Sequence, residues 1–258
     1  MVDSRTVRLV ATPSAVGALI LFVIALQITY PLMHGESRDR LTVAIVMMAA
    51  VACLIHACRS AGGKALGVLI SIGLFGYTVE VVGVQTGIPF GRYAYSSSLG
   101  PRAFGVPVIA ALAWIMMCWP AMLVARRLCN RTIPRVIVGA WALAAWDLFL
   151  DPQLVAAGHW HWKHARPHLP GVDTVPLTNF AGWLLVALVI SAALNGVLGT
   201  RSVSGDEPLL AFYLWTYVSS MIGLALFLRM PAAAAWGALG MGLIALPLAV
   251  RWRRRALC

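Results

Sequence analysis

The chain has 258 residues, of which 60% are hydrophobic and only 11% are charged. A soluble domain of this length carries roughly 25% charged residues. The low fraction of charged residues excludes an ordinary soluble domain and predicts that most of the surface faces lipid. The net charge of +11 comes from clustered arginines. Because no RNA- or DNA-binding motif accompanies them, nucleic acid is not an expected partner.

Long apolar stretches predict an all-α, polytopic transmembrane bundle that forms one integral membrane domain over residues 1–258. A spanning helix needs about 20 predominantly apolar residues. Eight stretches meet that condition: 15–33, 41–58, 65–84, 104–125, 134–150, 178–198, 209–229 and 231–250. The weakest boundary is at 229–231, where one broken helix would reduce the number of spans to seven. The third stretch is rich in glycine, which suits close helix packing, at Gly67, Gly73, Gly76 and Gly83.

The distribution of lysine and arginine predicts the orientation of these spans, because cytoplasmic loops carry an excess of both. With the N-terminus inside, thirteen of these residues fall on the inner side and seven on the outer side. We therefore expect a multi-pass protein of the cell membrane with both termini cytoplasmic. Its C-terminal WRRR run (residues 252–255) would lie against anionic lipid. Loops 85–103 and 151–177 would then share the outer face.

Three acidic residues stand out because they lie in or at the ends of the third and fifth spans: Glu80, Asp147 and Asp151. The six others fall in termini or loops, where we expect them to be solvated: Asp3, Glu36, Asp39, Asp173, Asp206 and Glu207. Asp147 and Asp151 are four residues apart and would share one helix face. Pro152 is expected to end that helix. All three carboxyl groups could meet at a similar depth near the outer face.

A carboxyl group in an apolar site tends to keep its proton, because its charged form is poorly solvated. A neutral acid facing an ionised neighbour is the usual arrangement for general acid–base catalysis. The alternative is that each acid pairs with Arg92, Arg102 or Lys163 and only holds the loops in place. Three acids converging beside aromatic residues favour the catalytic interpretation for the group.

Aromatic residues gather in and beside the two outer loops: Tyr93, Tyr95, Trp160, Trp162 and Trp183. They fit an interfacial aromatic belt. Their electron-rich faces could instead stabilise a cation. Asn179, at the start of the sixth span, could hydrogen-bond a carboxylate or a water molecule, or it could cap that helix.

Four histidines occupy the second outer loop: His159, His161, His164 and His168. Their H-x-H-x2-H-x3-H spacing is loose for a metal site. A membrane di-iron oxygenase would need more histidines, and the only others are His34 and His56. We therefore expect a plain surface loop and no bound metal.

The order and spacing of several motifs resemble the CruF-type integral-membrane carotenoid biosynthesis family over roughly residues 70–198. The motifs are Glu80, GIPFGRYAYSSSLGP (87–101), GVP (105–107) with Trp114, DLFLDP (147–152), HWHW (159–162) and VPLTNFAGW (175–183). Characterised members of that family are carotenoid 1,2-hydratases, including bisanhydrobacterioruberin hydratase. The approach to the last motif, HARPHLPGVDTVPLT, departs from the shorter, glycine-rich one that family members often show.

The resemblance implies water addition across the terminal C1–C2 double bond of an acyclic carotenoid end group, with no cofactor. One of Asp147 and Asp151 would be the acid, and the other, or Glu80, would be the base. The substrate would be bound by Tyr93, Tyr95, Trp160, Trp162, Trp183 and Arg92, with Asn179 orienting water. Two alternatives from other classes stay open: a metal-dependent membrane oxygenase that uses the histidine loop, and a non-enzymatic lipid carrier or transporter in which the acids relay protons. A third, within the family, is another reaction through the same kind of cation, such as cyclisation or isomerisation.

Overall fold

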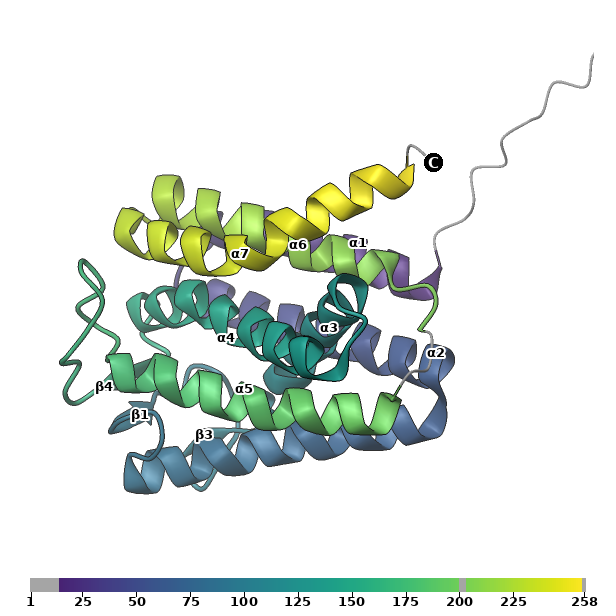
Figure 1. Ribbon diagram of the computed structural model, residues 1–258. Coiled ribbons are helices and arrows are strands. Elements are labelled where there is room, and N and C mark those ends of the chain that lie inside the picture. The colour runs from purple at the N-terminus through teal and green to yellow at the C-terminus, as the bar shows by residue number, and fades with distance from the viewer. Residues whose placement is uncertain (1–13, 200–202, 257–258) are drawn as a thin grey trace, which may run out of the picture.

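The computed structural model describes residues 14–199 and 203–256. It is a helical bundle with four short strands at one end (Figure 1). Within these residues, seven helices are long and apolar enough to cross a membrane, alone or with a short continuation. They are α1 (Ala15–Thr29), α2 (Gly35–Thr86), α3 (Ile109–Leu128), α4 (Thr132–Ala156), α5 (Leu177–Leu198), α6 (Glu207–Ile222) and α7 (Pro231–Ala256). The predicted fold class, a polytopic α-helical bundle, is therefore confirmed.

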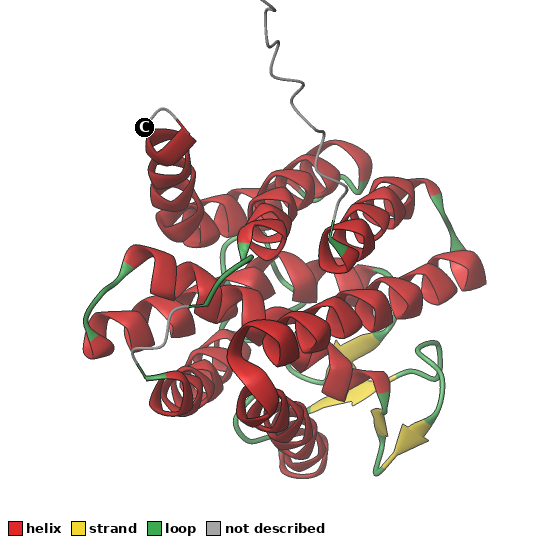
Figure 2. Ribbon diagram, turned by 90° about the vertical axis from the view of Figure 1, so that its right-hand side faces the viewer, coloured by secondary structure: helices red, strands yellow, loops and turns green. Residues whose placement is uncertain are grey.

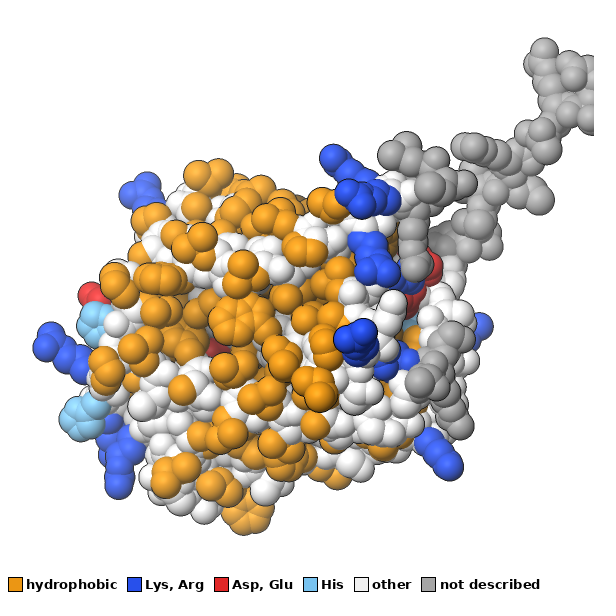
Figure 3. All heavy atoms as spheres, viewed as in Figure 1, with side chains coloured by type: hydrophobic (Ala, Val, Ile, Leu, Met, Phe, Trp, Pro, Cys, Tyr) orange, Lys and Arg blue, Asp and Glu red, His pale blue; other side chains and the backbone are white. Residues whose placement is uncertain are grey.

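The molecular surface has the character that a membrane protein requires. Figure 3 shows hydrophobic side chains across the middle of one face, with lysine and arginine side chains gathered towards the two ends of the bundle. Leu185, Leu226 and Leu243 are among the large apolar side chains that remain more than half exposed. Such a broad exposed apolar surface is typical of lipid contact. Which end of the bundle faces the cytoplasm, and hence the cytoplasmic location of both termini, stays a prediction.

Helix α2 accounts for the difference between eight predicted spans and seven observed helices. It has 52 residues, which at 1.5 Å per residue is about 78 Å, more than twice the thickness of a bilayer core. Gly62 lies near its middle with φ 82° and ψ −178°, which is not a helical conformation. The chain turns back there (Figure 1), so the two arms correspond to the predicted spans 41–58 and 65–84. A glycine makes this reversal without an intervening loop because it adopts positive φ readily.

The weak boundary at residues 229–231 is a real break. A π-helical turn, η2 (Gly223–Phe227), ends α6, and Arg229 has a φ of 55°. Pro231 then begins α7, in the first helical position where proline is favoured. Helices α6 and α7 lie side by side in Figure 1. The alternative of one broken helix at this point is therefore wrong.

Pro152 does not end α4, contrary to the prediction. The helix continues through Pro152 to Ala156, and both Pro152 and Leu154 are buried. A proline inside a helix removes a single backbone hydrogen bond, and burial of the last turn outweighs that loss. Asp147 and Asp151 consequently lie within one continuous helix, one turn apart.

Two small antiparallel strand pairs bring the long loops together at one end of the bundle (Figure 2). Strand β1 (Tyr93–Tyr95) pairs with β4 (Trp160–Trp162), and Tyr93 stands opposite Trp162. Strand β2 (Arg102–Ala103) pairs with β3 (Val106–Pro107) just before α3. Loops 85–103 and 151–177 therefore meet at one end of the bundle, and the prediction that this end is the outer face stays a prediction.

At the other end, one acidic residue that was expected to be solvated is buried. Asp206 precedes α6, is 5% exposed, and forms an ion pair with Arg127 of α3. The prediction for Asp206 is therefore wrong, because the arginine at the end of α3 supplies its counter-charge. Asp3 lies outside the described residues.

Candidate functional site

Two aspartates on α4 share one asparagine on α5. Asn179 lies in the first turn of α5, and Nδ2 donates to Oδ2 of Asp147 at 2.9 Å and also to Oδ2 of Asp151. All three side chains are buried. The cap position of α5 belongs to Pro176, so Asn179 is a partner of carboxyl groups and not a helix cap. Oδ1 of Asp147 has no hydrogen-bond partner among the described residues.

Glu80, on the second arm of α2, is bound by two tyrosine hydroxyls of β1. Its Oε2 accepts hydrogen bonds from Tyr93 and, at 3.0 Å, from Tyr95. Burial raises the pKa of both tyrosine hydroxyls, and the nearby charge of Glu80 raises it further. Both hydroxyls therefore stay protonated and act as donors. This pairing joins α2 to the strand pair and fixes the Glu80 carboxyl group.

None of these three carboxyl groups has a lysine or arginine nitrogen within 4.0 Å in the part of the chain that the structure describes. Arg92 and Lys163 are exposed, and Arg102 donates to the carbonyl of Tyr95 at 3.1 Å. The alternative that these arginines and the lysine clamp the acids is therefore wrong. Burying carboxyl groups without cations is costly and contributes nothing to stability as an ion pair, so another reason for their placement is required.

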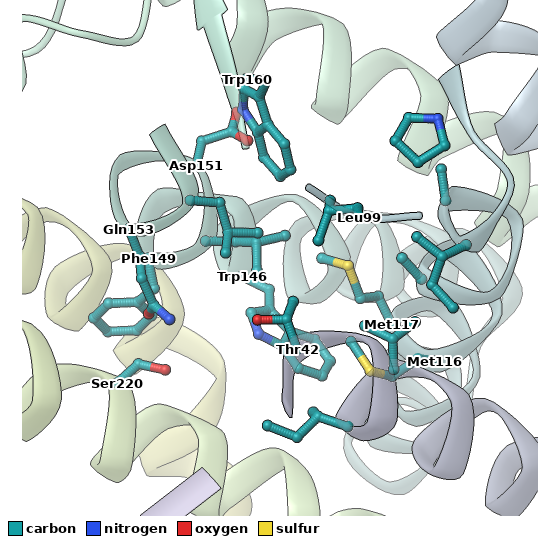
Figure 4. Close-up of a pocket in the computed structure, with 18 of the residues that line it drawn as sticks. Thr42, Leu99, Met116, Met117, Trp146, Phe149, Asp151, Gln153, Trp160 and Ser220 are labelled. Atoms are coloured by element: carbon teal, nitrogen blue, oxygen red, sulfur yellow. The ribbon is translucent and has the colours of Figure 1, made fainter. Parts of the chain in front are cut away.

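The carboxyl groups stand at one end of a cavity of about 200 Å³. Figure 4 shows Asp151 and Trp160 together at this end. Predicted residues that line it are Glu80, Tyr93, Tyr95, Asp151, Trp160, Trp162, Asn179 and Trp183. Two residues that were predicted to belong to the site, Asp147 and Arg92, do not line the cavity. Asp147 contacts Asn179 outside the cavity wall, and Arg92 is exposed on the loop. The place of Arg92 in a substrate-binding set is thus unsupported, since its side chain lies outside the cavity wall.

The aromatic rings of this end hold one another in place. Tyr93 stacks on Trp162 with ring centroids 5.6 Å apart, and Tyr95 meets Trp160 edge to face at 5.3 Å. The indole nitrogen of Trp162 donates to the carbonyl of Phe90 at 2.9 Å. These contacts follow from the β1–β4 register, which sets the tyrosines opposite the tryptophans. Several electron-rich ring faces therefore surround the carboxyl groups.

Sequence reasoning did not place several wall residues in the site: Tyr30, Trp114, Met116, Met117 and Trp146. The ring of Trp114 stacks on that of Trp183, with the ring centroids 4.3 Å apart and an angle of 18° between the ring planes. Tryptophans are enriched at membrane interfaces. The position of Trp114 and Trp146 within apolar spans was the signal that could have identified them.

The histidine loop does not form one cluster. His159 is buried, contrary to expectation, with Nδ1 2.8 Å from Oγ of Ser98 and Nε2 3.9 Å from Asp39. It directly precedes β4, which packs against the bundle. His161 and His164 are exposed. Within residues 14–199 and 203–256, no group of three or more His, Cys, Asp or Glu side chains is placed to hold a metal ion.

Comparison with known proteins gives two matches. The model of the family described as "Carotenoid biosynthesis protein" matches residues 41–247. Bisanhydrobacterioruberin hydratase of Haloarcula japonica is 31% identical over 171 residues, which cover 62% of this chain and 55% of that protein. The chain thus spans little more than half the length of this curated relative. No solved structure matches the chain. Because the family match covers most of the chain, including Glu80, Asp151 and every aromatic residue of the cavity except Tyr30, the chain belongs to the carotenoid biosynthesis protein family.

Proposed function

We propose that the protein is a carotenoid hydratase that adds water across the terminal C1–C2 double bond of an acyclic carotenoid end group. The proposal rests on one observation above all: buried carboxyl groups without cationic partners stand at the aromatic end of a cavity inside a lipid-facing bundle. The family membership and the relative named as a hydratase support the same reaction. The apolar wall suits the polyene end group, and the rest of the polyene would extend towards lipid.

Asp151 is the proton donor in this mechanism, because it lines the cavity whereas Asp147 does not. Its carboxyl proton passes to C2 as the C1–C2 π bond breaks, which leaves a tertiary cation at C1. The ring faces of Tyr95, Trp160 and Trp162 line the same end and would stabilise that cation. Asp147 is a positioning residue that holds the Asn179 amide, and through it the Asp151 carboxyl group.

Glu80 is the base. It lines the same cavity as Asp151. A water molecule forms the C1–O bond and gives one proton to Glu80, which yields a tertiary alcohol. Return of that proton to Asp151 restores both groups, so the net reaction is addition of one water molecule. The hydroxyls of Tyr93 and Tyr95 keep Glu80 oriented throughout.

Pigment analysis tests the proposal. A host that accumulates acyclic carotenoids should form a tertiary alcohol when it produces this protein, and in water enriched in ¹⁸O the new hydroxyl should carry the label. A metal-dependent oxygenase would take its label from ¹⁸O₂ instead. A carrier or transporter would leave the carotenoids chemically unchanged, and either of these results would overturn the proposal.

A further inference from the structure

The cavity has a second polar region, which the proposed mechanism does not use. Its side chains are all neutral: Gln27, Tyr30, Thr42, Gln153, Ser219 and Ser220. Figure 4 shows Thr42 and Ser220 across the cavity from Asp151 and Trp160. The region is built by η1 (Tyr30–Leu32), the first arm of α2, the end of α4 and α6. One continuous cavity therefore joins an acidic aromatic end to a neutral hydrogen-bonding end.

Tyr30 is the central residue of this second region. Its side chain is 8% exposed, and its hydroxyl is buried with no hydrogen-bond partner among the described residues. Gln153 and Thr42 line the cavity wall together with Tyr30. Thr42 already donates to the carbonyl of Arg38 at 2.9 Å, and the Arg38 guanidinium lies 5.4 Å from the centre of the Tyr30 ring. The ring is thus held in place while its hydroxyl remains unsatisfied.

An unsatisfied buried hydroxyl destabilises a fold unless a ligand completes it. The side chains of Gln153, Ser219 and Ser220 likewise make no hydrogen bond within the described residues, although all three residues line the cavity. Among the residues that the structure describes, no charged side chain lines this region, so it does not suit a carboxylate or a phosphate. Hydroxyl and amide groups that can both donate and accept suit a ligand hydroxyl group.

We propose that Tyr30, with Gln153 and Ser220, binds a hydroxyl group that the carotenoid already carries before it reacts at the acidic end. This inference rests on the proposed function for the identity of the ligand, and it narrows the substrate class to hydroxylated acyclic carotenoids. Tyr30 determines specificity in this scheme and takes no part in the chemistry. A purely hydrocarbon carotenoid would enter the same cavity and leave the Tyr30 hydroxyl unpaired.

Binding measurements test this without relying on turnover. The full chain in detergent is mixed with two acyclic carotenoids of equal polyene length, one with a hydroxyl group and one without, and the retained pigment is measured. The wild type should retain the hydroxylated compound about tenfold better. Tyr30→Phe should abolish that preference without weakening hydrocarbon binding. The unliganded Tyr30→Phe variant should unfold at no lower temperature than the wild type, because only an unpaired hydroxyl is removed.

Tyr217→Phe is the matched control. The Tyr217 hydroxyl donates to the carbonyl of Ala238 at 3.4 Å and is not in the cavity wall, so this variant should keep the preference. Gln153→Met is a second test of the same region and should reduce the preference. Equal binding of both carotenoids by the wild type, or an undiminished preference in Tyr30→Phe, would overturn the inference. Failure of the isotope experiment would overturn the hydratase function and leave the binding comparison intact.

Discussion

Nδ2 of Asn179 lies 2.9 Å from Oδ2 of Asp147, and the same amide group donates to Asp151. One asparagine thus sets the direction of two carboxyl groups that stand one turn apart on α4. Only Asp151 reaches the cavity wall. Asp151 therefore faces the cavity, whereas Asp147 holds the asparagine from the side away from the cavity. The i, i+4 spacing in the sequence does not distinguish these two positions.

Asp151→Asn should abolish hydration. The amide keeps the shape of the side chain but cannot donate a proton of comparable acidity, and loss of a general acid typically lowers a rate by about 10²–10⁴-fold. Conversion is measured as the ratio of alcohol to unreacted carotenoid in a producing host. Asp173→Asn is the matched control, because Asp173 is exposed on the loop and should be dispensable. Normal product from Asp151→Asn would remove this residue from the mechanism.

Asp147→Asn should lower the rate by about tenfold and leave measurable product, because the change affects only the placement of Asn179. An amide at position 147 can still accept one hydrogen bond from Asn179. The comparison with Asp151→Asn therefore separates a positioning residue from a proton donor. Equal loss in both variants would contradict the assignment of the acid to Asp151.

The contact between Glu80 and Tyr95 gives a prediction about stability. Glu80→Leu removes the acceptor of the Tyr95 hydroxyl, whereas the Tyr93 hydroxyl keeps the Glu80 carbonyl at 3.3 Å. An orphaned buried hydroxyl costs about 1–3 kcal/mol. The double variant Glu80→Leu/Tyr95→Phe should regain most of that loss in chemical unfolding in detergent. Were the double variant as unstable as the single one, the hydroxyl would not be the cause.

His159 should make the stability of the fold depend on pH. Burial lowers the pKa of this histidine, an effect that Asp39 partly offsets. The folded state therefore binds fewer protons than the unfolded state, whose histidine has a pKa of about 6.5. The stabilisation is complete above that pH and is lost as the pH falls through the lower pKa of the folded state.

Thermal unfolding between pH 8 and pH 5 measures this dependence. His159→Gln should flatten the fall in unfolding temperature on acidification. His161→Gln, at an exposed position two residues away, should keep it. An unchanged profile in His159→Gln would show that another group is responsible.

The helices could be predicted from the sequence, as could the shared helix face of Asp147 and Asp151, because both depend on local patterns; the roles of the acidic residues stay predictions. Apolar length identifies spans, and the spacing of Asp147 and Asp151 places them on one helix face. The same patterns could not show that Gly62 lets two spans join without a loop, or that α4 passes through Pro152. Those outcomes depend on tertiary packing, which outweighs local preference.

The second polar region of the cavity could not be predicted from the sequence, for a related reason. Tyr30, Gln153 and Ser220 lie far apart in the chain and belong to no common motif. Each is unremarkable alone, and only the fold brings them to one wall. The glycine-rich run of the third span shows the same limit, because composition cannot tell which glycine faces a neighbouring helix.

Substitutions at Gly76 and Gly67 test which glycine of the third predicted span faces a neighbouring helix. A Cβ atom at Gly76 would lie 2.3 Å from Cγ of Trp114, whereas one at Gly67 would have no neighbour within 4 Å. Gly76→Ala should therefore displace Trp114, disturb its stacking on Trp183, and reduce both stability and carotenoid conversion, since overpacking costs about 1–3 kcal/mol. Gly67→Ala should leave conversion unchanged and raise stability slightly, because alanine is favoured over glycine within a helix by about 1 kcal/mol. Unfolding in detergent and pigment ratios measure both effects. Equal behaviour of the two variants would contradict a close contact between α2 and α3 at Trp114.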